Sequence, residues 1–444
     1  MEHDAGHVLA TALSHAFLAA PGWGLDDLTA AGARVLGARR RWLGPLARAV
    51  LGAYQRKPAD APRELASVIA ASAPFTDAVA KAHAQRKPLR VAAYAVAGPE
   101  LRQAVRSVPD IAGLGTLAEI LGLTPGELDW FADTGHWNRL APRGPLQHYR
   151  YVWRERPGRT PRLLEIPGLR LRAVQRTVLD SLLAPIPLHG AAHGFVPGRS
   201  AASGAARHTG TDVVICLDLV SFFAKVTAGK VYGALRQAGY PEAVAHSLTG
   251  LCTHAVPPRV IGAMPPGGTP AERFALVHAL RLPHLPQGAP TSPALANVAL
   301  RRLDSRLAGW ADKAGANYTR YADDLSFSAG PALARRADSF VRGTQRIVAA
   351  EGHALNERKT RVRPRGTRQQ VTGVVVNQHV NAPRRQFETL KAVLHNCALH
   401  GPESQNRAGH PDFRAQLLGR ITWMESLNPA RGLRLRRDFE RVSW

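Results

Sequence analysis

The hydrophobic pattern of the chain changes from helical spacing to strand-like runs along its length. Up to about residue 115, apolar residues recur at helical spacing, as at Leu46, Val50 and Tyr54, and prolines interrupt the segment. This part is therefore predicted to be a bundle of short helices. Farther along, residues 169–183 carry an apolar stripe that predicts a single amphipathic helix.

Strand-like patterns occupy the middle of the chain. Residues 148–153 and 162–167 alternate between apolar and polar side chains around a Pro-Gly turn, which predicts a β-hairpin. Residues 213–217 form a continuous apolar run, which is typical of a buried strand. A second alternating pair, residues 318–321 and 325–328, predicts another hairpin.

In the sequence, helical patterns lie between these predicted strands and after them. We predict helices over residues 230–245, 294–310 and 332–351, and an irregular Gly/Pro-rich loop over residues 257–270. Apolar stripes after residue 383 predict a further set of helices.

Two adjacent carboxylates, Asp323 and Asp324, lie at the tip of the second predicted hairpin. Like charges repel, and a purely structural turn more often uses Asp-Gly or Asn-Gly. A third carboxylate, Asp218, ends the apolar run, at the strand end where open sheets place ligands. On neighbouring strands, the three side chains can hold two Mg²⁺ ions about 3.5–4 Å apart for in-line nucleotidyl transfer. The alternative is a solvated pair of loop aspartates, against which the upstream strand and Asp218 argue.

The charge of the chain indicates a polyanionic partner. Among 444 residues, 58 Lys and Arg exceed 33 Asp and Glu, which gives a formal net charge of +25. Such an excess points to nucleic acid and to salt-dependent binding. The 3 cysteines have no metal-ligand spacing. Polar residues interrupt the apolar residues 8–20, so we expect a helix of a cytoplasmic protein without membrane contact rather than a signal peptide.

Three motifs stand in the order that is typical of one enzyme family. Asp218 is followed by Leu285-Pro286-Gln287-Gly288 and then by Tyr321-Ala322-Asp323-Asp324. On these residues, about two thirds of the chain resembles reverse transcriptases, and specifically the bacterial retron enzymes. Val371-Thr372-Gly373, with an apolar run and Asn377 after it, resembles a further retron motif.

The resemblance implies an α+β protein with the right-hand polymerase fold. This fold has fingers, a palm with an antiparallel sheet and a helical thumb, here preceded by an all-α N-terminal region. The expected boundaries are 1–115 for the α-helical N-terminal extension, 116–147 for a short helical linker segment, 148–382 for the fingers and palm, and 383–444 for the helical thumb. In the linker segment, Thr116 with Glu119 and Thr124 with Glu127 predict two capping boxes.

The resemblance also assigns roles at the catalytic centre. Asp218, Asp323 and Asp324 would hold two Mg²⁺ ions. Lys359 would protonate or neutralise the leaving pyrophosphate, with a solvated lysine as the alternative. Arg162 would grip the triphosphate of the incoming nucleotide as a fixed cation, with a surface arginine as the alternative.

Other residues would contact the nucleotide and the primer–template. Phe223 would exclude the ribose 2′-hydroxyl, because an aromatic ring leaves no room for that oxygen, whereas Phe222 is expected to point into the core. Gln287 would bond the sugar or the base edge of the nucleotide. Gly288 would let the backbone approach the primer–template pair.

RNA contacts are expected at three places. Arg199 would lie near the template strand. Val371, Thr372 and Gly373 would recognise the structured part of the cognate RNA. Residues 371–377 as a whole are expected to form an ordinary β-strand on the thumb side, which by itself needs no RNA contact. A basic face for a duplex backbone is expected from four arginines near the C-terminus: Arg431, Arg434, Arg436 and Arg437.

The function implied by the resemblance is that of a retron RNA-directed DNA polymerase. It would copy a cognate structured non-coding RNA, prime from a 2′-hydroxyl of that RNA, and use dNTPs to make a branched RNA–DNA product (msDNA). Retron systems act in antiphage defence, so an effector protein is expected as a third partner. The alternatives are another bacterial reverse transcriptase, of group II intron or abortive-infection type, and an RNA-binding scaffold without catalysis.

Overall fold

The computed structural model of the chain describes residues 2–54, 57–58, 60–95, 108–142 and 144–444. Residues 96–107, which belong to the predicted N-terminal extension, lie outside the described residues. The chain divides into a first unit, Met1–Pro187 with Phe223–Ala299, and a second unit, Leu188–Phe222 with Leu300–Trp444. Helices combine with antiparallel strands, so the predicted α+β class is confirmed.

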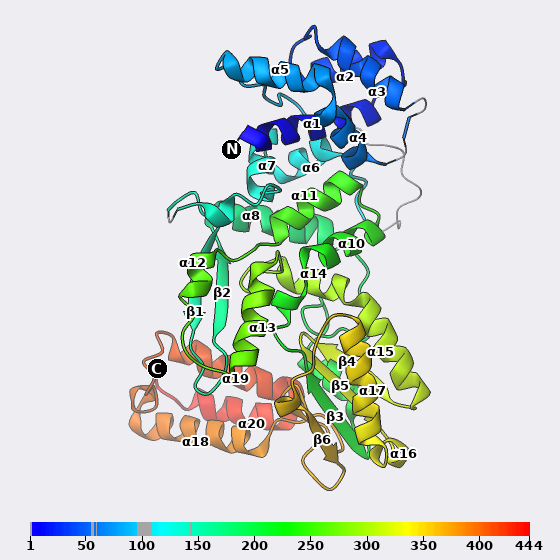
Figure 1. Ribbon diagram of the computed structural model, residues 1–444. Coiled ribbons are helices and arrows are strands. Elements are labelled where there is room, and N and C mark those ends of the chain that lie inside the picture. Colours follow the sequence, from blue (N-terminus) through cyan, green and yellow to red (C-terminus); the bar gives the residue numbers. More distant parts are fainter. Residues whose placement is uncertain (1, 55–56, 59, 96–107, 143) are drawn as a thin grey trace. The chain divides into compact units, whose positions relative to one another are not determined.

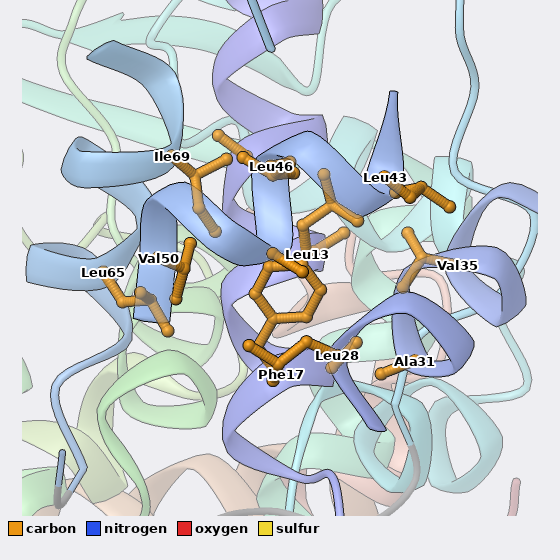
Figure 2. Close-up of a cluster of buried hydrophobic side chains, with 14 of the residues drawn as sticks. Leu13, Phe17, Leu28, Ala31, Val35, Leu43, Leu46, Val50, Leu65 and Ile69 are labelled. Carbon is orange, nitrogen blue, oxygen red and sulfur yellow. The ribbon is translucent and has the colours of Figure 1, made fainter. Parts of the chain in front are cut away.

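Helices near the N-terminus enclose an apolar core within the first unit (Figure 2). They are α1 (Glu2–Leu18), α2 (Leu25–Leu36), α3 (Leu43–Ala53), α4 (Pro62–Ala71) and α5 (Ala73–Ala84). Leu46 and Val50 of α3 are fully buried in this core beside Phe17 of α1, while Tyr54 follows the end of α3. The predicted spacing therefore marks the buried face. Full burial of each such side chain contributes about 1.5–3 kcal/mol.

Two short helices follow, α6 (Leu114–Leu121) and α7 (Pro125–Ala132). The capping box predicted for α7 is confirmed, because Glu127 N donates to the Thr124 hydroxyl at 3.3 Å and Thr124 N donates to the Glu127 carboxylate at 3.0 Å. The capping box predicted at Thr116 is wrong, because α6 begins earlier, after Gly113. The earlier start brings Leu114 onto the buried face, and this burial outweighs one cap.

The first predicted hairpin is formed by β1 (Tyr149–Arg154) and β2 (Arg162–Pro167), which pair antiparallel with Arg154 opposite Arg162. Leu163 of β2 packs with Leu280 and Val260 in one apolar cluster. The latter two come from α13 (Pro270–Arg281) and α12 (Pro258–Gly262), which lie beside the hairpin (Figure 1). The irregular loop predicted over residues 257–270 is therefore wrong at its start, since burial of Val260 stabilises a short helix there.

Further helices of the first unit are α8 (Leu169–Thr177), which continues into a π-helical stretch (Val178–Leu183), α10 (Ala228–Ala238), α11 (Glu242–Cys252) and α14 (Ser292–Ala299). The predicted stripe along residues 169–183 is confirmed, since Leu171 and Leu182 are buried. The single helix predicted over residues 230–245 is wrong. Gly239 adopts a left-handed φ of 106° and Pro241 precedes α11, so the chain forms two helices.

Four antiparallel strands form the sheet of the second unit, in the order β4-β5-β3-β6 (Figure 1). They are β3 (Val213–Asp218), β4 (Asn317–Tyr321), β5 (Asp324–Ala329) and β6 (Arg361–Pro364). The apolar run and the second hairpin are thus confirmed as strands, and they are neighbours. Phe327 of β5 meets Phe340 of α17 (Ala337–Ala350) with ring centroids 5.1 Å apart, which packs this helix on the sheet.

Two predicted helices of this region are interrupted. The one over residues 294–310 divides into α14 and α15 (Arg301–Lys313), because the backbone leaves helical geometry at Leu300, with φ −88° and ψ 2°. The one over residues 332–351 divides into α16 (Pro331–Ala334) and α17, with a similar departure at Arg336. Apolar periodicity continues across both breaks, so the pattern alone did not reveal them.

The opposite face of the sheet shares a core with the C-terminal helices. The elements involved are α9 (Ala201–Ala205), β7 (Gln370–Val371), β8 (Val374–Val375), α18 (Arg384–His400), α19 (Phe413–Leu427) and α20 (Pro429–Glu440). Val214 of β3 lies in this cluster with Val371 and Leu417. The single strand considered for residues 371–377 is wrong, because Thr372 and Gly373 both have positive φ and turn the chain into a small hairpin. Within the described ranges, no helix combines the length and apolar character needed to cross a bilayer.

Candidate active site

Three carboxylates converge at one end of the sheet of the second unit. Asp218 is the last residue of β3, Asp324 is the first residue of β5, and the two lie directly opposite each other in the antiparallel register. Directly opposed residues share one face of a sheet, with Cβ atoms about 4.5–5.5 Å apart. Asp323 precedes Asp324, and its carbonyl accepts a hydrogen bond from Leu219 N at 3.0 Å. The structure therefore brings together the three residues on which the sequence prediction depends.

The hairpin tip that carries these residues has an unusual backbone. Ala322 and Asp323 connect β4 to β5, and Ala322 adopts a φ of 54°. A left-handed residue with a Cβ is uncommon and persists only where its surroundings enforce it. The Arg320 guanidinium is part of these surroundings, because its Nη1 donates a hydrogen bond to the Ala322 carbonyl at 3.2 Å.

The carboxylates perturb one another electrostatically. Burial raises the pKa of Asp324 to about 6, together with the negative charges of Asp323 and Asp218, while Lys359 acts in the opposite direction. Lys359 Nζ lies 2.6 Å from Asp218 Oδ2, and its side chain is 42% exposed. The short 3₁₀ helix Glu357–Lys359 delivers this lysine, and Asn356 N before it donates to the Asp218 carbonyl at 2.8 Å. The predicted lysine and the predicted carboxylate thus form an ion pair.

The chemistry of this group fits a divalent cation. Carboxylate oxygens are hard ligands, and three of them concentrate negative charge at one point. Among the residues that the structure describes, no three His, Cys, Asp or Glu side chains are already spaced to hold a metal ion. In the triad, the Lys359 ammonium engages Asp218 and acts as its counter-ion. A metal ion that binds here must therefore compete with Lys359.

Four other predicted residues, Arg162, Phe223, Gln287 and Gly288, belong to the first unit. Arg162 is exposed at the start of β2. Phe223 begins a 3₁₀ helix (Phe223–Lys225) and is half-buried, whereas Phe222 before it is only 6% exposed. The prediction that Phe222 points into the core is confirmed, and Phe223 keeps an accessible surface.

The Gln287-Gly288 loop is hydrogen-bonded to β2. The Gln287 carbonyl accepts a hydrogen bond from Glu165 N at 2.9 Å. Gly288 has a φ of 138°, and a Cβ at this position would lie 2.9 Å from Glu165 O, so both conformation and packing require glycine. Just before this loop in the chain, His284 places its Nε2 3.1 Å from the Glu165 carboxylate, and both side chains are buried. Burial lowers the pKa of His284, but the charge and hydrogen bond of Glu165, together with the Leu282 carbonyl, outweigh burial and leave this pKa raised.

The structure also contains buried ion pairs that sequence reasoning did not find. In the first unit, Glu165 pairs with His284; in the second, Asp304 of α15 pairs with Arg320 of β4 at 2.7 Å. A signal for each acid was present. Glu165 stands on the inward-facing side of β2 with Leu163, and Asp304 falls within the apolar stripe of α15. A charged residue in a buried register needs a partner, but the pattern does not say which one.

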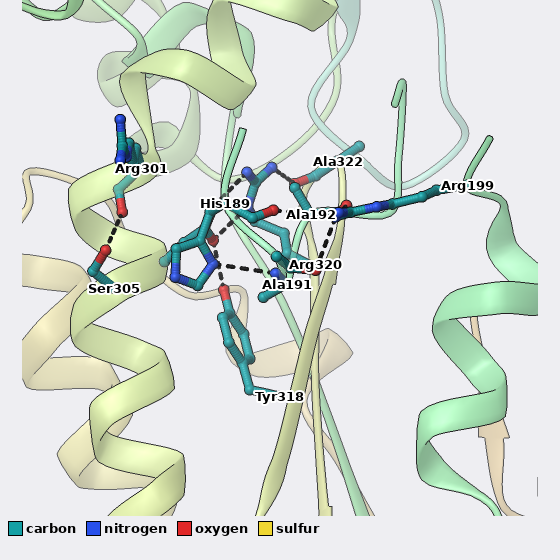
Figure 3. A network of polar contacts seen from close by, with 11 residues as sticks. His189, Ala191, Ala192, Arg199, Arg301, Ser305, Tyr318, Arg320 and Ala322 are labelled. Carbon is teal, nitrogen blue, oxygen red and sulfur yellow. Dashed lines mark hydrogen bonds and ion pairs between the residues drawn. The ribbon is translucent and has the colours of Figure 1, made fainter. Parts of the chain in front are cut away.

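The predicted RNA contacts all belong to the second unit, among them Arg199 and the segment from Val371 to Gly373. Arg199 Nη1 donates to the carbonyls of His189, Gly190 and Ala192, at 3.2, 2.8 and 2.6 Å (Figure 3). This guanidinium therefore closes the loop that precedes it. Val371 is buried in the core shared with the C-terminal helices, while the turn after it is half-buried at Thr372 and exposed at Gly373. Contact of these residues with RNA stays a prediction.

Comparison with known proteins identifies the family of this chain. Residues 155–376 match the family described as Reverse transcriptase (RNA-dependent DNA polymerase). The chain is also similar to the Retron Mx65 reverse transcriptase of Myxococcus xanthus, with 40% identity over 330 residues that cover 72% of this chain and 70% of that protein. This chain belongs to the retron reverse transcriptases.

Two further relatives agree with this family. The Retron Mx162 reverse transcriptase of Myxococcus xanthus is 35% identical over 356 residues, which cover 77% of this chain and 69% of that protein. The Retron Ec86 reverse transcriptase of Escherichia coli is 31% identical over 252 residues, 56% of this chain and 69% of that protein. As a retron reverse transcriptase, the protein is an RNA-directed DNA polymerase, so the predicted family and enzyme class are confirmed.

Proposed function

We propose that Asp218, Asp323 and Asp324 are the catalytic carboxylates of this retron reverse transcriptase and that they bind two Mg²⁺ ions. The observation that carries the proposal is the register of β3 and β5, in which Asp218 stands opposite Asp324. Like charges directly opposed on a sheet are destabilising, and a bound cation relieves this repulsion. When bound, the metal ions would lower the pKa of the attacking hydroxyl and neutralise the leaving pyrophosphate.

Lys359 has two tasks in this proposal. Its ammonium neutralises Asp218, from which it lies 2.6 Å away. During synthesis, the released ammonium would neutralise or protonate the pyrophosphate. Its partly exposed side chain supports both tasks, because lysine carries its charge on a flexible four-carbon stem.

The incoming nucleotide would be recognised by residues of the first unit. Arg162 would bind the triphosphate as a point of fixed positive charge, and Phe223 would exclude the ribose 2′-hydroxyl. Gln287 would bond the sugar or base edge, and Gly288 would admit the primer–template backbone. The exposure of Arg162, the accessible ring of Phe223 and the anchoring of the Gln287-Gly288 loop to β2 support these roles.

The domain assignment follows from the same proposal. Residues 148–382 would form the fingers and palm, and residues 383–444 the helical thumb. Residues 1–115 would be the N-terminal extension and residues 116–147 the linker segment. The antiparallel sheet and the β1–β2 hairpin within residues 148–382, and α18 to α20 within residues 383–444, support these boundaries.

The product and its use complete the proposal. The enzyme would copy a cognate structured non-coding RNA from dNTPs, prime from a guanosine 2′-hydroxyl of that RNA, and yield the branched RNA–DNA called msDNA. It would work in the cytoplasm, in antiphage defence, with an effector protein as a partner. The net charge of +25 supports a polyanionic partner, and we assign RNA contacts to Arg199, Val371, Thr372 and Gly373.

The catalytic assignment is tested by Asp323→Asn with Asp324→Asn. The amide keeps the size of each side chain but removes its negative charge, so DNA synthesis on the co-purified RNA should fall to background. Asp312→Asn, at an exposed carboxylate of α15, is the matched control and should keep full activity. DNA synthesis that persists in the double variant contradicts the assignment of these acids as the catalytic carboxylates.

The branched product has its own test. Nucleic acid extracted from the purified protein is treated with a debranching enzyme and separated on a gel. A short DNA that shifts after treatment supports 2′-hydroxyl priming. A DNA of unchanged mobility contradicts it and favours ordinary priming, as in other bacterial reverse transcriptases.

A further inference from the structure

The turn that carries Asp323 is contacted by the side chain of a buried ion pair and lies against a neighbouring loop. We propose that the buried Arg320–Asp304 pair and the loop at Gly194 position the Asp323–Asp324 turn for nucleotidyl transfer. Arg320 and Asp304 are then positioning residues of the polymerase, and they act without touching the substrate. This inference rests on the proposed catalytic role of the triad.

Asp304 fixes the plane of the Arg320 guanidinium. Arg320 Nε and Nη2 donate to Asp304 Oδ1 and Oδ2, both at 2.7 Å, and both side chains are 0% exposed. The Tyr318 hydroxyl donates to Asp304 Oδ1 at 2.8 Å. Such a two-pronged pair sets orientation as well as attraction. A buried ion pair adds little net stability over apolar side chains of the same size, so stability alone does not account for it.

The third guanidinium nitrogen reaches the turn itself. Arg320 Nη1 donates to the Ala322 carbonyl at 3.2 Å (Figure 3). Ala322 is the left-handed residue of the turn, with a φ of 54°, and its carbonyl belongs to the peptide that leads into Asp323. The guanidinium therefore connects α15, through Asp304, to the peptide that orients Asp323.

A loop braces the same hairpin through its backbone. Arg320 N donates to the Ala191 carbonyl at 2.7 Å, and the Arg320 carbonyl accepts from His193 N at 2.8 Å. The next residue, Gly194, lies so close to the turn that a Cβ there would be 2.7 Å from Ala322 N. The turn is therefore held by the Arg320 side chain and by the backbone of this loop.

The decisive variant replaces the charged pair by apolar side chains of similar size. Asp304→Leu and Arg320→Met are combined in a Tyr318→Phe background, so that no buried charge or hydroxyl is left without a partner. Tyr318→Phe alone is the matched control. Thermal unfolding, kcat and KM for a dNTP, and Mn²⁺ affinity measured by electron paramagnetic resonance are compared between the two proteins.

A positioning role predicts a folded but slow enzyme. The melting temperature should stay close to that of the control, kcat should fall about 100-fold, and the Mn²⁺ dissociation constant should rise. Arg320→Lys, made in the otherwise wild-type protein, keeps the positive charge but loses the two-pronged pair with Asp304 and the hydrogen bond to the Ala322 carbonyl. Its kcat should therefore stay well below that of the wild type. Unchanged kcat and unchanged Mn²⁺ affinity in the folded variant would overturn the inference.

Gly194→Ala tests the loop without altering any charge, and it decides the matter if the triple variant does not fold. The added methyl group must displace the turn backbone, so kcat should fall and Mn²⁺ affinity should weaken. Gly309→Ala, on the exposed surface of α15 where a Cβ meets nothing within 4 Å, is the matched control. Wild-type kcat with unchanged Mn²⁺ affinity in Gly194→Ala would contradict the proposal that this loop positions the Asp323–Asp324 turn.

The two levels of proposal fail differently. If Asp323→Asn with Asp324→Asn keeps DNA synthesis, the catalytic role of the triad is wrong. If that variant is inactive while the Arg320 and Gly194 variants keep their kcat and Mn²⁺ affinity, the triad stands and only the positioning role is wrong.

Discussion

The protonation and pairing of individual acidic residues in this reverse transcriptase depend on the charges beside them. Asp218, Asp323 and Asp324 could be selected from the sequence, because acids that end a buried strand or occupy a hairpin tip are conspicuous. Their protonation could not be predicted from the sequence, because the raised pKa of Asp324 comes from burial and from carboxylates that only folding brings near it. The counter-ion Lys359 was recognised as a candidate, but its contact with Asp218 appears only in three dimensions.

This contact makes metal binding and Lys359 competitors. Lys359→Met should lower the melting temperature in EDTA, because Asp218 loses its counter-ion, and should increase the stabilisation produced by Mg²⁺, because the metal no longer displaces an ammonium. Thermal unfolding across a Mg²⁺ titration measures both effects. Lys313→Met, at the exposed end of α15, is the control. A Mg²⁺-dependent shift equal to that of the wild type would contradict the competition.

Phe223 provides a second test at this scale. Phe223→Ala should raise the kcat/KM for ribonucleotides relative to deoxynucleotides about 10–100-fold, because the space that the ring filled then accepts a 2′-hydroxyl. Steady-state incorporation of matched rNTP and dNTP pairs measures the ratio. Phe223→Tyr keeps the ring and should keep the discrimination. An unchanged ratio in Phe223→Ala removes this residue from the role of sugar gate.

Elements were predictable where periodicity and turn chemistry agree. The β1–β2 and β4–β5 hairpins and the strand β3 follow the alternating and continuous patterns. Helix boundaries failed where a local feature interrupts a continuing apolar stripe, as at Gly239 and Leu300. The β7–β8 hairpin was hidden because a β-branched residue, Thr372, occupies a left-handed turn position that sequence rules assign to glycine or asparagine.

This hairpin allows its fold and its RNA contacts to be separated. Thr372→Gly suits the left-handed turn better than threonine, so stability should be kept, while loss of the side chain should weaken cognate RNA binding about tenfold. Filter binding with cognate and unrelated RNA measures the difference. Gly366→Ala, where a Cβ meets nothing within 4 Å, is the control. Equal losses on both RNAs would reduce the turn to a support of the fold.

The charge of the whole molecule governs its attraction to nucleic acid. The net charge of +25 could be predicted to favour a polyanion, but its distribution could not. On α20, Arg434 and Arg437 are exposed, whereas Arg436 binds Glu425 at 2.7 Å and Arg431 lies 5.0 Å from the centroid of the Phe387 ring. The predicted basic face is therefore strongest at Arg434 and Arg437, whose side chains are exposed.

RNA binding should become less salt-dependent when these two charges are removed. Arg434→Gln with Arg437→Gln should flatten the slope of log K against log salt by about 0.7–0.9 for each phosphate that the protein no longer neutralises. Affinity measured at several salt concentrations gives the slope. Arg342→Gln with Arg346→Gln, on the exposed face of α17, removes the same charge elsewhere. Equal slopes for both double variants would mean that net charge, rather than the α20 face, binds the RNA.

Local patterns along the chain were sufficient to recognise the strands and the three carboxylates, because each is encoded within a few neighbouring residues, and the order of three such local motifs was sufficient to recognise the enzyme class. Other features needed the folded molecule: the pairing of Arg320 with Asp304, the contact of Lys359 with Asp218, and the close fit of Gly194 against the turn. These join residues from separate elements, and their partners are selected by packing. Periodicity reports which face of an element is buried, but not what that face meets.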